Sequence, residues 1–263
     1  MKYYAASQGN DTYPDSDNNA EGAYLLKPAM WNRFQYAYSR LETAETIQTM
    51  NYLTQWTFKY VSYLTQEFAI VNVKFFPGFS ESIEFDVELD GVSVMRDNQG
   101  KDVTVNWIFD NFTANSTFWT DSNGLEMQER HLNYRPTWNY SGDQNISANY
   151  YPVNSGIAMR SITPENSTRQ VTVINERSTG GSADLSFKGG IELIHNRRLL
   201  KDDNRGVGEP LNETDALGFG MRVNSRYWLQ IIDYNTTRSG QRQQQLLVDL
   251  PLQYFFAFNY SAS

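Results

Sequence analysis

A strict alternation of apolar and acidic residues between positions 83 and 90 limits that segment to a β-strand. Successive side chains of a strand point to opposite faces, so such a segment has one apolar face and one charged face. A half-exposed antiparallel strand requires this pattern. Asp90-Gly91 ends the run and predicts a hairpin turn. The alternating residues are Ile83, Phe85, Val87 and Leu89 on one face and Glu84, Asp86, Glu88 and Asp90 on the other.

Further segments along the chain read as short strands. The mixed pattern from 33 to 66 and the short run 22–26 are also interpreted as strands, whereas 9–20 is polar and predicts a loop. The apolar stretch 246–258 predicts a late strand that Pro251 interrupts. Many short strands without a convincing long helix predict an all-β fold, an antiparallel β-sandwich. We expect a first β block at 1–110 and a second at 111–263, or one continuous sandwich. The other alternating runs are 103–109, 171–173, 191–193 and 229–231.

The overall charge argues against nucleic acid as a partner. The 263 residues carry a formal net charge of -8, with a pI near 4.9, whereas a nucleic-acid-binding protein needs a basic face. There are no cysteines, so neither disulfides nor thiolate metal sites are expected. No apolar run is long enough to span a membrane.

The clearest indication of the cellular compartment is a set of Asn-x-Ser/Thr glycosylation sequons. Their density favours the secretory pathway, although some arise by chance in a chain rich in Asn, Ser and Thr. The first residues lack the apolar core of a signal peptide. We therefore expect the chain to be a piece of a longer protein. The candidate sites are Asn10, Asn111, Asn115, Asn139, Asn145, Asn166, Asn212, Asn235 and Asn259.

Three segments are distinctive. The first reads FWTDSNGLE at 118–126 and continues to YRPTW at 134–138; the second reads NYYPVN at 149–154; the third runs from 178 to RRLLKDDNRGVGEPL at 197–211. Within the first, Asp and Asn bonding their own backbone and a Gly that allows positive φ predict a tight turn at 120–124. The third places three arginines and two aspartates within nine residues. This arrangement is either a structural salt-bridge cluster or a functional loop.

In this order and spacing, the segments resemble the C-terminal region of glycoside hydrolase family 38, the retaining α-mannosidases, and the lysosomal type most of all. The resemblance implies the C-terminal β-sandwich part of an enzyme that hydrolyses terminal α-linked mannose from N-glycan oligosaccharides, in the lysosome or after secretion. It also implies an N-terminal α/β catalytic part that holds the zinc and the catalytic carboxylates. We therefore expect no catalytic carboxylate and no metal ligand here, and read His131 and His195 as ordinary residues.

The resemblance also implies that a tyrosine and an arginine from this region reach the sugar site. By motif position these are Tyr24 in Gly22-Ala23-Tyr24 and Arg205 in Asp203-Asn204-Arg205-Gly206, with Arg198 in reserve. A phenol can bond a sugar hydroxyl, and a guanidinium can orient an acidic residue or a hydroxyl. We expect Asp202 and Asp203 to hold an arginine by bidentate pairing. For Tyr24, a core tyrosine on a strand is the competing interpretation.

Two further hypotheses remain open. One is a stand-alone carbohydrate-binding β-domain without catalysis, because aromatic residues make up 14% of the chain. Its candidate sugar platforms are Trp119, Trp138, Tyr150 and Tyr151. The other is a purely structural scaffold that supports a catalytic neighbour, which the expected absence of catalytic groups favours.

Overall fold

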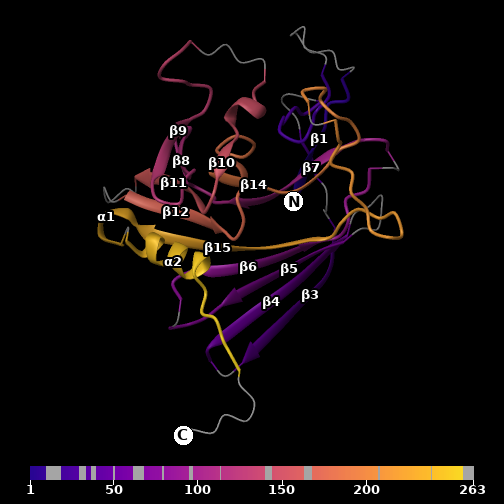
Figure 1. Ribbon diagram of the computed structural model, residues 1–263. Coiled ribbons are helices and arrows are strands. Elements are labelled where there is room, and N and C mark those ends of the chain that lie inside the picture. Colours follow the sequence, from indigo (N-terminus) through magenta and orange to yellow (C-terminus); the bar gives the residue numbers. More distant parts are fainter. Residues whose placement is uncertain are drawn as a thin grey trace, which may run out of the picture.

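The described residues form two antiparallel sheets that pack face to face (Figure 1). The computed structural model describes residues 1–9, 19–29, 34–36, 40–49, 51–61, 68–78, 80–94, 97–112, 114–139, 144–162, 168–206, 208–237 and 239–256. The six-stranded sheet has the order β10 (Tyr151–Val153), β13 (Thr179–Ala183), β14 (Gly190–Arg198), β7 (Lys101–Ile108), β1 (Lys2–Ala5) and β2 (Gln35–Tyr36). The nine-stranded sheet has the order β3 (Arg40–Thr49), β4 (Leu53–Val61), β5 (Phe68–Phe75), β6 (Ile83–Leu89), β15 (Val223–Asp233), β12 (Thr168–Asn175), β11 (Gly156–Ile162), β8 (Thr117–Asp121) and β9 (Met127–His131).

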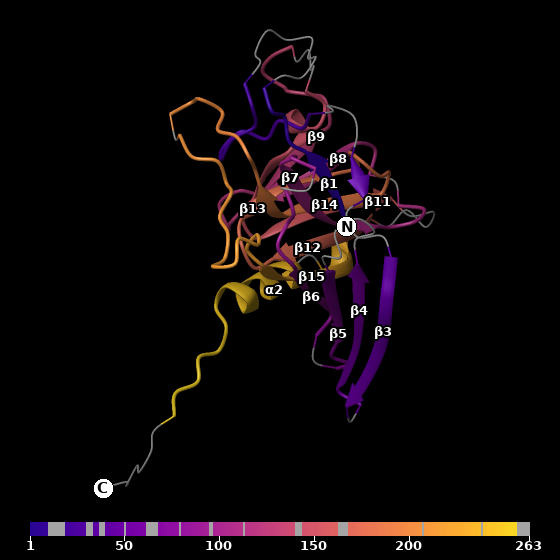
Figure 2. The ribbon, with the colours of Figure 1, turned by 90° about the vertical axis from the view of Figure 1, so that its right-hand side faces the viewer.

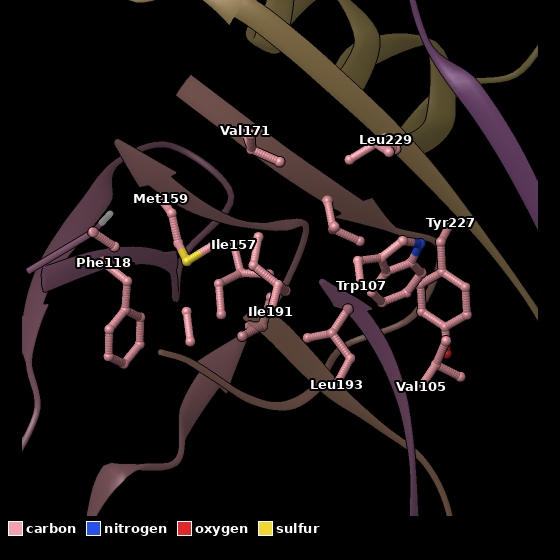
Figure 3. Packing of buried hydrophobic residues seen from close by; sticks show 14 of the residues in the cluster. Val105, Trp107, Phe118, Ile157, Met159, Val171, Ile191, Leu193, Tyr227 and Leu229 are labelled. Carbon is pink, nitrogen blue, oxygen red and sulfur yellow. The ribbon is translucent and has the colours of Figure 1, made fainter. Parts of the chain in front are cut away.

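The predicted all-β sandwich is confirmed, and its core lies between the two sheets. Trp107 of β7 and Tyr227 of β15 meet edge to face, with ring centroids 5.1 Å apart. Figure 3 shows both rings among the aliphatic side chains of the opposing sheets. Strand pairing also joins the two expected blocks, since β6 pairs with β15 and β7 pairs with β14.

The alternation at 83–90 forms β6 as predicted. Val87 and Leu89 are fully buried, whereas Glu84 lies on the opposite face and forms a 3.0 Å ion pair with Lys74 of β5. The tight turn at 120–124 is confirmed as the link between β8 and β9. Asp121 Oδ1 accepts the backbone N–H groups of residues 123 and 124, at 3.0 and 2.6 Å.

The hairpin predicted at Asp90-Gly91 is wrong. The next strand, β7, begins only at Lys101 and lies in the other sheet. Gly91 is needed for a different reason: a Cβ at this position would collide with the backbone carbonyl of Gly220. The dipeptide therefore marks a close approach of two chain segments.

Two other strand predictions are also wrong. Residues 22–26 form a turn closed by an isolated bridge between Gly22 and Leu25. The stretch from 246 begins in a helix, and residues 251–256 form no strand and are exposed. Helices α1 (Tyr234–Thr237) and α2 (Ser239–Asp249) follow β15, and a 3₁₀ turn occupies Ser147–Asn149. Neither α1 nor α2, among the described residues, has the length and hydropathy of a membrane-spanning helix.

The mixed pattern at 33–66 does hold strands, as predicted, since β3 and β4 lie within it. The polar loop predicted at 9–20 falls mostly outside the described residues.

Candidate functional site

The candidate site lies where the end of β14 meets the turn that carries Tyr24. Arg197 donates from Nη1 to the Ala23 carbonyl at 2.8 Å. Its Nη2 donates to the carbonyls of Gly22 and Leu25, at 3.2 and 3.1 Å. One guanidinium therefore fixes the backbone of this turn at three carbonyl groups.

Two buried carboxylates hold that guanidinium. Arg197 Nε lies 2.6 Å from Asp102 Oδ1, and Nη2 lies 2.7 Å from Glu21 Oε1; both acidic side chains are fully buried. Burial and the neighbouring Asp102 raise the pKa of Glu21 well above its usual range, although Arg197 opposes the shift. Burial lowers the pKa of Arg197, but Asp102 and Glu21 outweigh this effect and raise it. The cation thus stays charged between two acids, of which Glu21 takes up a proton readily.

The turn of Tyr24 packs directly against the turn of Arg205. A Cβ placed on Gly22 would lie 2.5 Å from Cγ of Asp203, so only glycine allows this approach. Asp203 is 1% exposed, and its Oδ1 accepts the backbone N–H of Arg205 at 2.9 Å. The structure therefore joins the two segments that carry the predicted sugar-site residues.

Both predicted sugar-site side chains are accessible. Tyr24 is 58% exposed, which excludes a core tyrosine, and Arg205 is exposed as well. Asn204 (φ 57°) and Gly206 (φ 112°) flank Arg205 in the left-handed region, and Asp202 Oδ2 accepts the Asn204 N–H at 3.0 Å. Such a sharp turn presents Arg205 at its tip. A phenol and a guanidinium on adjoining turns can bind hydroxyls or a carboxylate.

Arg198, the reserve candidate, is buried inside the same region. Its Nη1 donates to the Val92 carbonyl at 2.7 Å, and its Nε donates to Asn212 Oδ1 at 2.8 Å. These bonds tie the end of β14 to the loops that follow β6 and precede β15. Arg198 therefore links the end of β14 to these two loops.

The two histidines have separate environments. His131 of β9 contacts Glu129 at 2.9 Å and Thr117 at 3.1 Å. His195 of β14 is buried and lies 2.8 Å from the Tyr227 hydroxyl. Burial lowers the pKa of His195 to about 4. Across the described ranges, no three His, Cys, Asp or Glu side chains are grouped so as to hold a metal ion.

Three of the four aromatic candidates for sugar stacking, Trp119, Tyr150 and Tyr151, are half-buried and contact other side chains. The Arg160 guanidinium lies 3.9 Å from the Trp119 ring centre, and the Tyr150 hydroxyl donates to Glu192 at 2.5 Å. Tyr151 lies beneath the Arg130 guanidinium at 4.5 Å. Trp138 is 61% exposed.

The sequons divide by accessibility. Asn145 and Asn212 are half-buried, and Asn10, Asn166 and Asn259 lie outside the described residues. The exposed ones are Asn111, Asn115, Asn139 and Asn235.

The sequence did not reveal Glu21 and Asp102 as the carboxylates that hold an arginine. Asp202 and Asp203, the carboxylates predicted to hold an arginine, accept the backbone N–H groups of Asn204 and Arg205. Two weak local features point to Asp102 and Glu21. Asp102 is a charged residue at the start of an apolar strand pattern, and Glu21 directly precedes the Gly22-Ala23-Tyr24 motif.

Comparisons with known proteins agree with these motifs. A family model described as the C-terminal domain of glycosyl hydrolases family 38 matches residues 12–205. The lysosomal α-mannosidase of Bos taurus is 35% identical over 247 residues, which are 92% of this chain and 22% of that protein. The lysosomal α-mannosidase of Homo sapiens is 33% identical over 91% of this chain and 21% of that protein. The corresponding enzyme of Felis catus is 44% identical over 48% of this chain and 12% of its own length.

The chain spans about a fifth of the length of the Bos taurus and Homo sapiens relatives. Among solved structures, a GH36 α-galactosidase of Geobacillus stearothermophilus aligns with a TM-score of 0.40 and 10% identity over 86% of this chain and 35% of that chain, too distant a likeness to carry an argument. The family model includes Tyr24, and its match ends at Arg205. The chain therefore belongs to glycoside hydrolase family 38, and residues 12–205 correspond to the C-terminal domain of that family.

Proposed function

We propose that this chain completes the sugar site of a retaining α-mannosidase that releases terminal α-linked mannose from N-glycan oligosaccharides. The observation that carries the proposal is the packing of Gly22 against Asp203, which places accessible Tyr24 and Arg205 on adjoining turns. The match to lysosomal α-mannosidases supports the reaction class. Those names and the exposed sequons also support the lysosome, or secretion, as the location of the parent enzyme.

The chemistry is divided between two parts of that enzyme. A retaining glycosidase needs a nucleophilic carboxylate and an acid/base carboxyl about 5–5.5 Å apart. We assign both, and any zinc, to a separate N-terminal α/β catalytic part. Zinc would supply a Lewis acid that binds the sugar hydroxyls there.

This chain's contribution is orientation and electrostatics. The Arg205 guanidinium presents several N–H donors in one plane, so it can hold a carboxylate or two sugar hydroxyls in a fixed direction. The Tyr24 hydroxyl can donate to one oxygen while it accepts from another. Arg197 acts through both, because it fixes the turn of Tyr24, against which the turn of Arg205 packs.

Co-production of the chain with the N-terminal part of the enzyme tests this division. Hydrolysis of 4-nitrophenyl α-mannoside is measured for the N-terminal part alone and for the two parts together. We expect efficient turnover only when both are present and folded. Equal turnover without the chain would exclude it from the sugar site.

A second candidate is direct glycan binding by the chain alone. Trp138 and Tyr134, 61% and 55% exposed, stand in the stretch of chain after β9, and exposed aromatic faces stack on pyranose rings. Calorimetric titration of the folded chain with high-mannose glycan tests it. Heat of binding that disappears in Trp138→Ala supports this function, and absence of binding excludes it.

A further inference from the structure

The nine-stranded sheet extends beyond the six-stranded sheet. In both ribbon views, the far ends of β3, β4 and β5 project away from the sandwich, and no described strand of the other sheet lies over them (Figures 1 and 2). The opposite end of β4 is covered, because Val61 is 6% exposed. The nine-stranded sheet thus extends beyond the edge of the packed core.

The side of this extension that continues the core is apolar. Trp56 and Phe58 of β4 pair with Val73 and Val71 of β5, which pair in turn with Phe85 and Val87 of β6. Val87 is fully buried in the core, whereas Trp56, Phe58 and Val73 are half-exposed and Phe75 is 37% exposed. We call Trp56, Phe58, Val73 and Phe75 the overhang face.

The other side of the same strands is polar and internally bonded. Thr57 donates to Asn72 Oδ1 at 2.7 Å, and Gln55 donates to the same atom at 3.3 Å. On this side Lys74 pairs with Glu84 at 3.0 Å. The contrast between the two sides is that of a sheet with one side built for water and one built for burial. Contiguous apolar surface that remains exposed is typical of an interaction site.

Met1 lies at the inner end of the overhang face. A cavity of about 180 Å³ lies between the sheets at this point. Met1 lines it together with Tyr60, Val71, Phe85 and Trp107. In the proposed function, the catalytic part precedes this chain in sequence. A segment joined to Met1 would therefore leave the fold beside the overhang face.

We propose that the overhang face is the docking surface for the N-terminal catalytic part of the same α-mannosidase. The proposal rests on the proposed function, because that function supplies the occupant. The matched part of the Bos taurus relative is 22% of its length, so a much larger body is available to cover the face. Interfaces between domains of one protein commonly bury roughly 600–1,500 Å². One side of a three-stranded extension can supply part of that area.

Substitutions on the two opposite faces of β4 test the docking. Phe58→Asp places a charge on the overhang face, and Thr57→Asp places the same charge on the polar side of the neighbouring position. The chain is produced together with the N-terminal part, each with its own affinity tag. The amount of chain retained with the N-terminal part is then measured, and circular dichroism confirms that each variant is folded.

We expect Phe58→Asp to lower the retained amount at least tenfold and Thr57→Asp to leave it close to the wild-type amount. Phe58→Thr, which keeps the strand propensity, should give an intermediate loss if Phe58→Asp does not fold. Equal retention of all three variants would overturn the proposal. A dimer of the isolated chain, seen by light scattering and broken by Phe58→Asp, would also overturn it in favour of a second copy.

The failure of this proposal is distinguishable from failure of the sugar-site proposal. Docking is read by retention, whereas the sugar site is read by turnover of the assembled enzyme. Arg205→Ala should assemble normally. If Arg205→Ala leaves turnover unchanged while Phe58→Asp abolishes retention, the docking surface stands and the sugar-site role fails.

Discussion

The carboxylate of Asp203 packs against the Cα of Gly22, with its Cγ 2.5 Å from the position that a Cβ would occupy. This contact joins the turn of Tyr24 to the turn of Arg205. Substitution of Gly22 by alanine therefore forces the two turns apart. Overpacking of this kind costs about 1–3 kcal/mol of unfolding free energy.

We predict that Gly22→Ala lowers kcat/KM of the assembled enzyme because it displaces both proposed sugar-site residues. The matched control is Gly240→Ala in α2, where the nearest atom to an added Cβ is Glu81 Oε2 at 3.8 Å. Alanine in a helix is about 1 kcal/mol better than glycine, so the control should unfold at the same or a higher temperature. Equal unfolding temperature and equal kcat/KM of the two variants would show that the contact between Gly22 and Asp203 does not position the two turns.

The Arg197 cluster predicts a stability change that depends on pH. Arg197→Met leaves Glu21 and Asp102 buried without a cation, and breaking a buried pair from one side costs about 3–5 kcal/mol. The pKa of Glu21 is already raised in the folded protein, and loss of Arg197 removes the group that opposes this shift. A raised carboxyl pKa stabilises the fold at low pH and loses that contribution as pH rises through the folded pKa. The variant should therefore be destabilised less near pH 4 than at pH 7.

Urea unfolding of the wild type and of Arg197→Met at both pH values measures the effect. Glu21→Gln combined with Arg197→Met should recover part of the loss at pH 7, because one uncompensated charge is removed. A destabilisation independent of pH and not relieved in the double variant would show that the charges are not the cause.

His195 predicts a second pH dependence of opposite sign. Burial lowers the pKa of His195 to about 4 from its usual 6.5; the Val223 carbonyl opposes this shift, and Arg177 adds to it. Because the unfolded chain binds the proton more readily, this contribution is present above pH 6.5 and is lost as pH falls from 6.5 to 4. The full difference is about 3 kcal/mol, at roughly 1.4 kcal/mol per pKa unit.

His195→Gln removes the titration while an amide keeps groups for bonding Tyr227 and Val223. Unfolding free energies at pH 7 and pH 4.5 should show a steeper loss for the wild type than for His195→Gln. Parallel losses would mean that His195 does not set this dependence. NMR titration of the His195 ring gives the folded pKa directly.

The sequence predicted features with a local cause. Alternation at 83–90 identified β6 and its faces, because side-chain direction in a strand repeats every two residues. Asp121 and Gly124 identified a turn, because both act on their own backbone. The segments around 118–211 identified the family because their spacing is specific.

Features with a distant cause were missed. Arg197 takes its carboxylates from positions 176 and 95 residues away, and no local pattern predicts such a pairing. Helix α2 was missed because its buried side is polar rather than apolar. Gln245 donates to Ser155 at 3.0 Å, and Gln241 accepts from Gln170 at 2.5 Å, so the helix lacks the hydrophobic period that identifies helices.

The central claim is that this chain supplies Arg205 to the sugar site. Its most direct test is kcat/KM of Arg205→Ala in the assembled α-mannosidase, beside the unfolding temperature of the same variant and an exposed-arginine control, Arg222→Ala. We predict a loss of roughly 10²-fold in kcat/KM with little change in unfolding temperature, because Arg205 is exposed and lies at the tip of a turn. Turnover of Arg205→Ala within a factor of two of the control would contradict the claim and leave the chain as a structural scaffold.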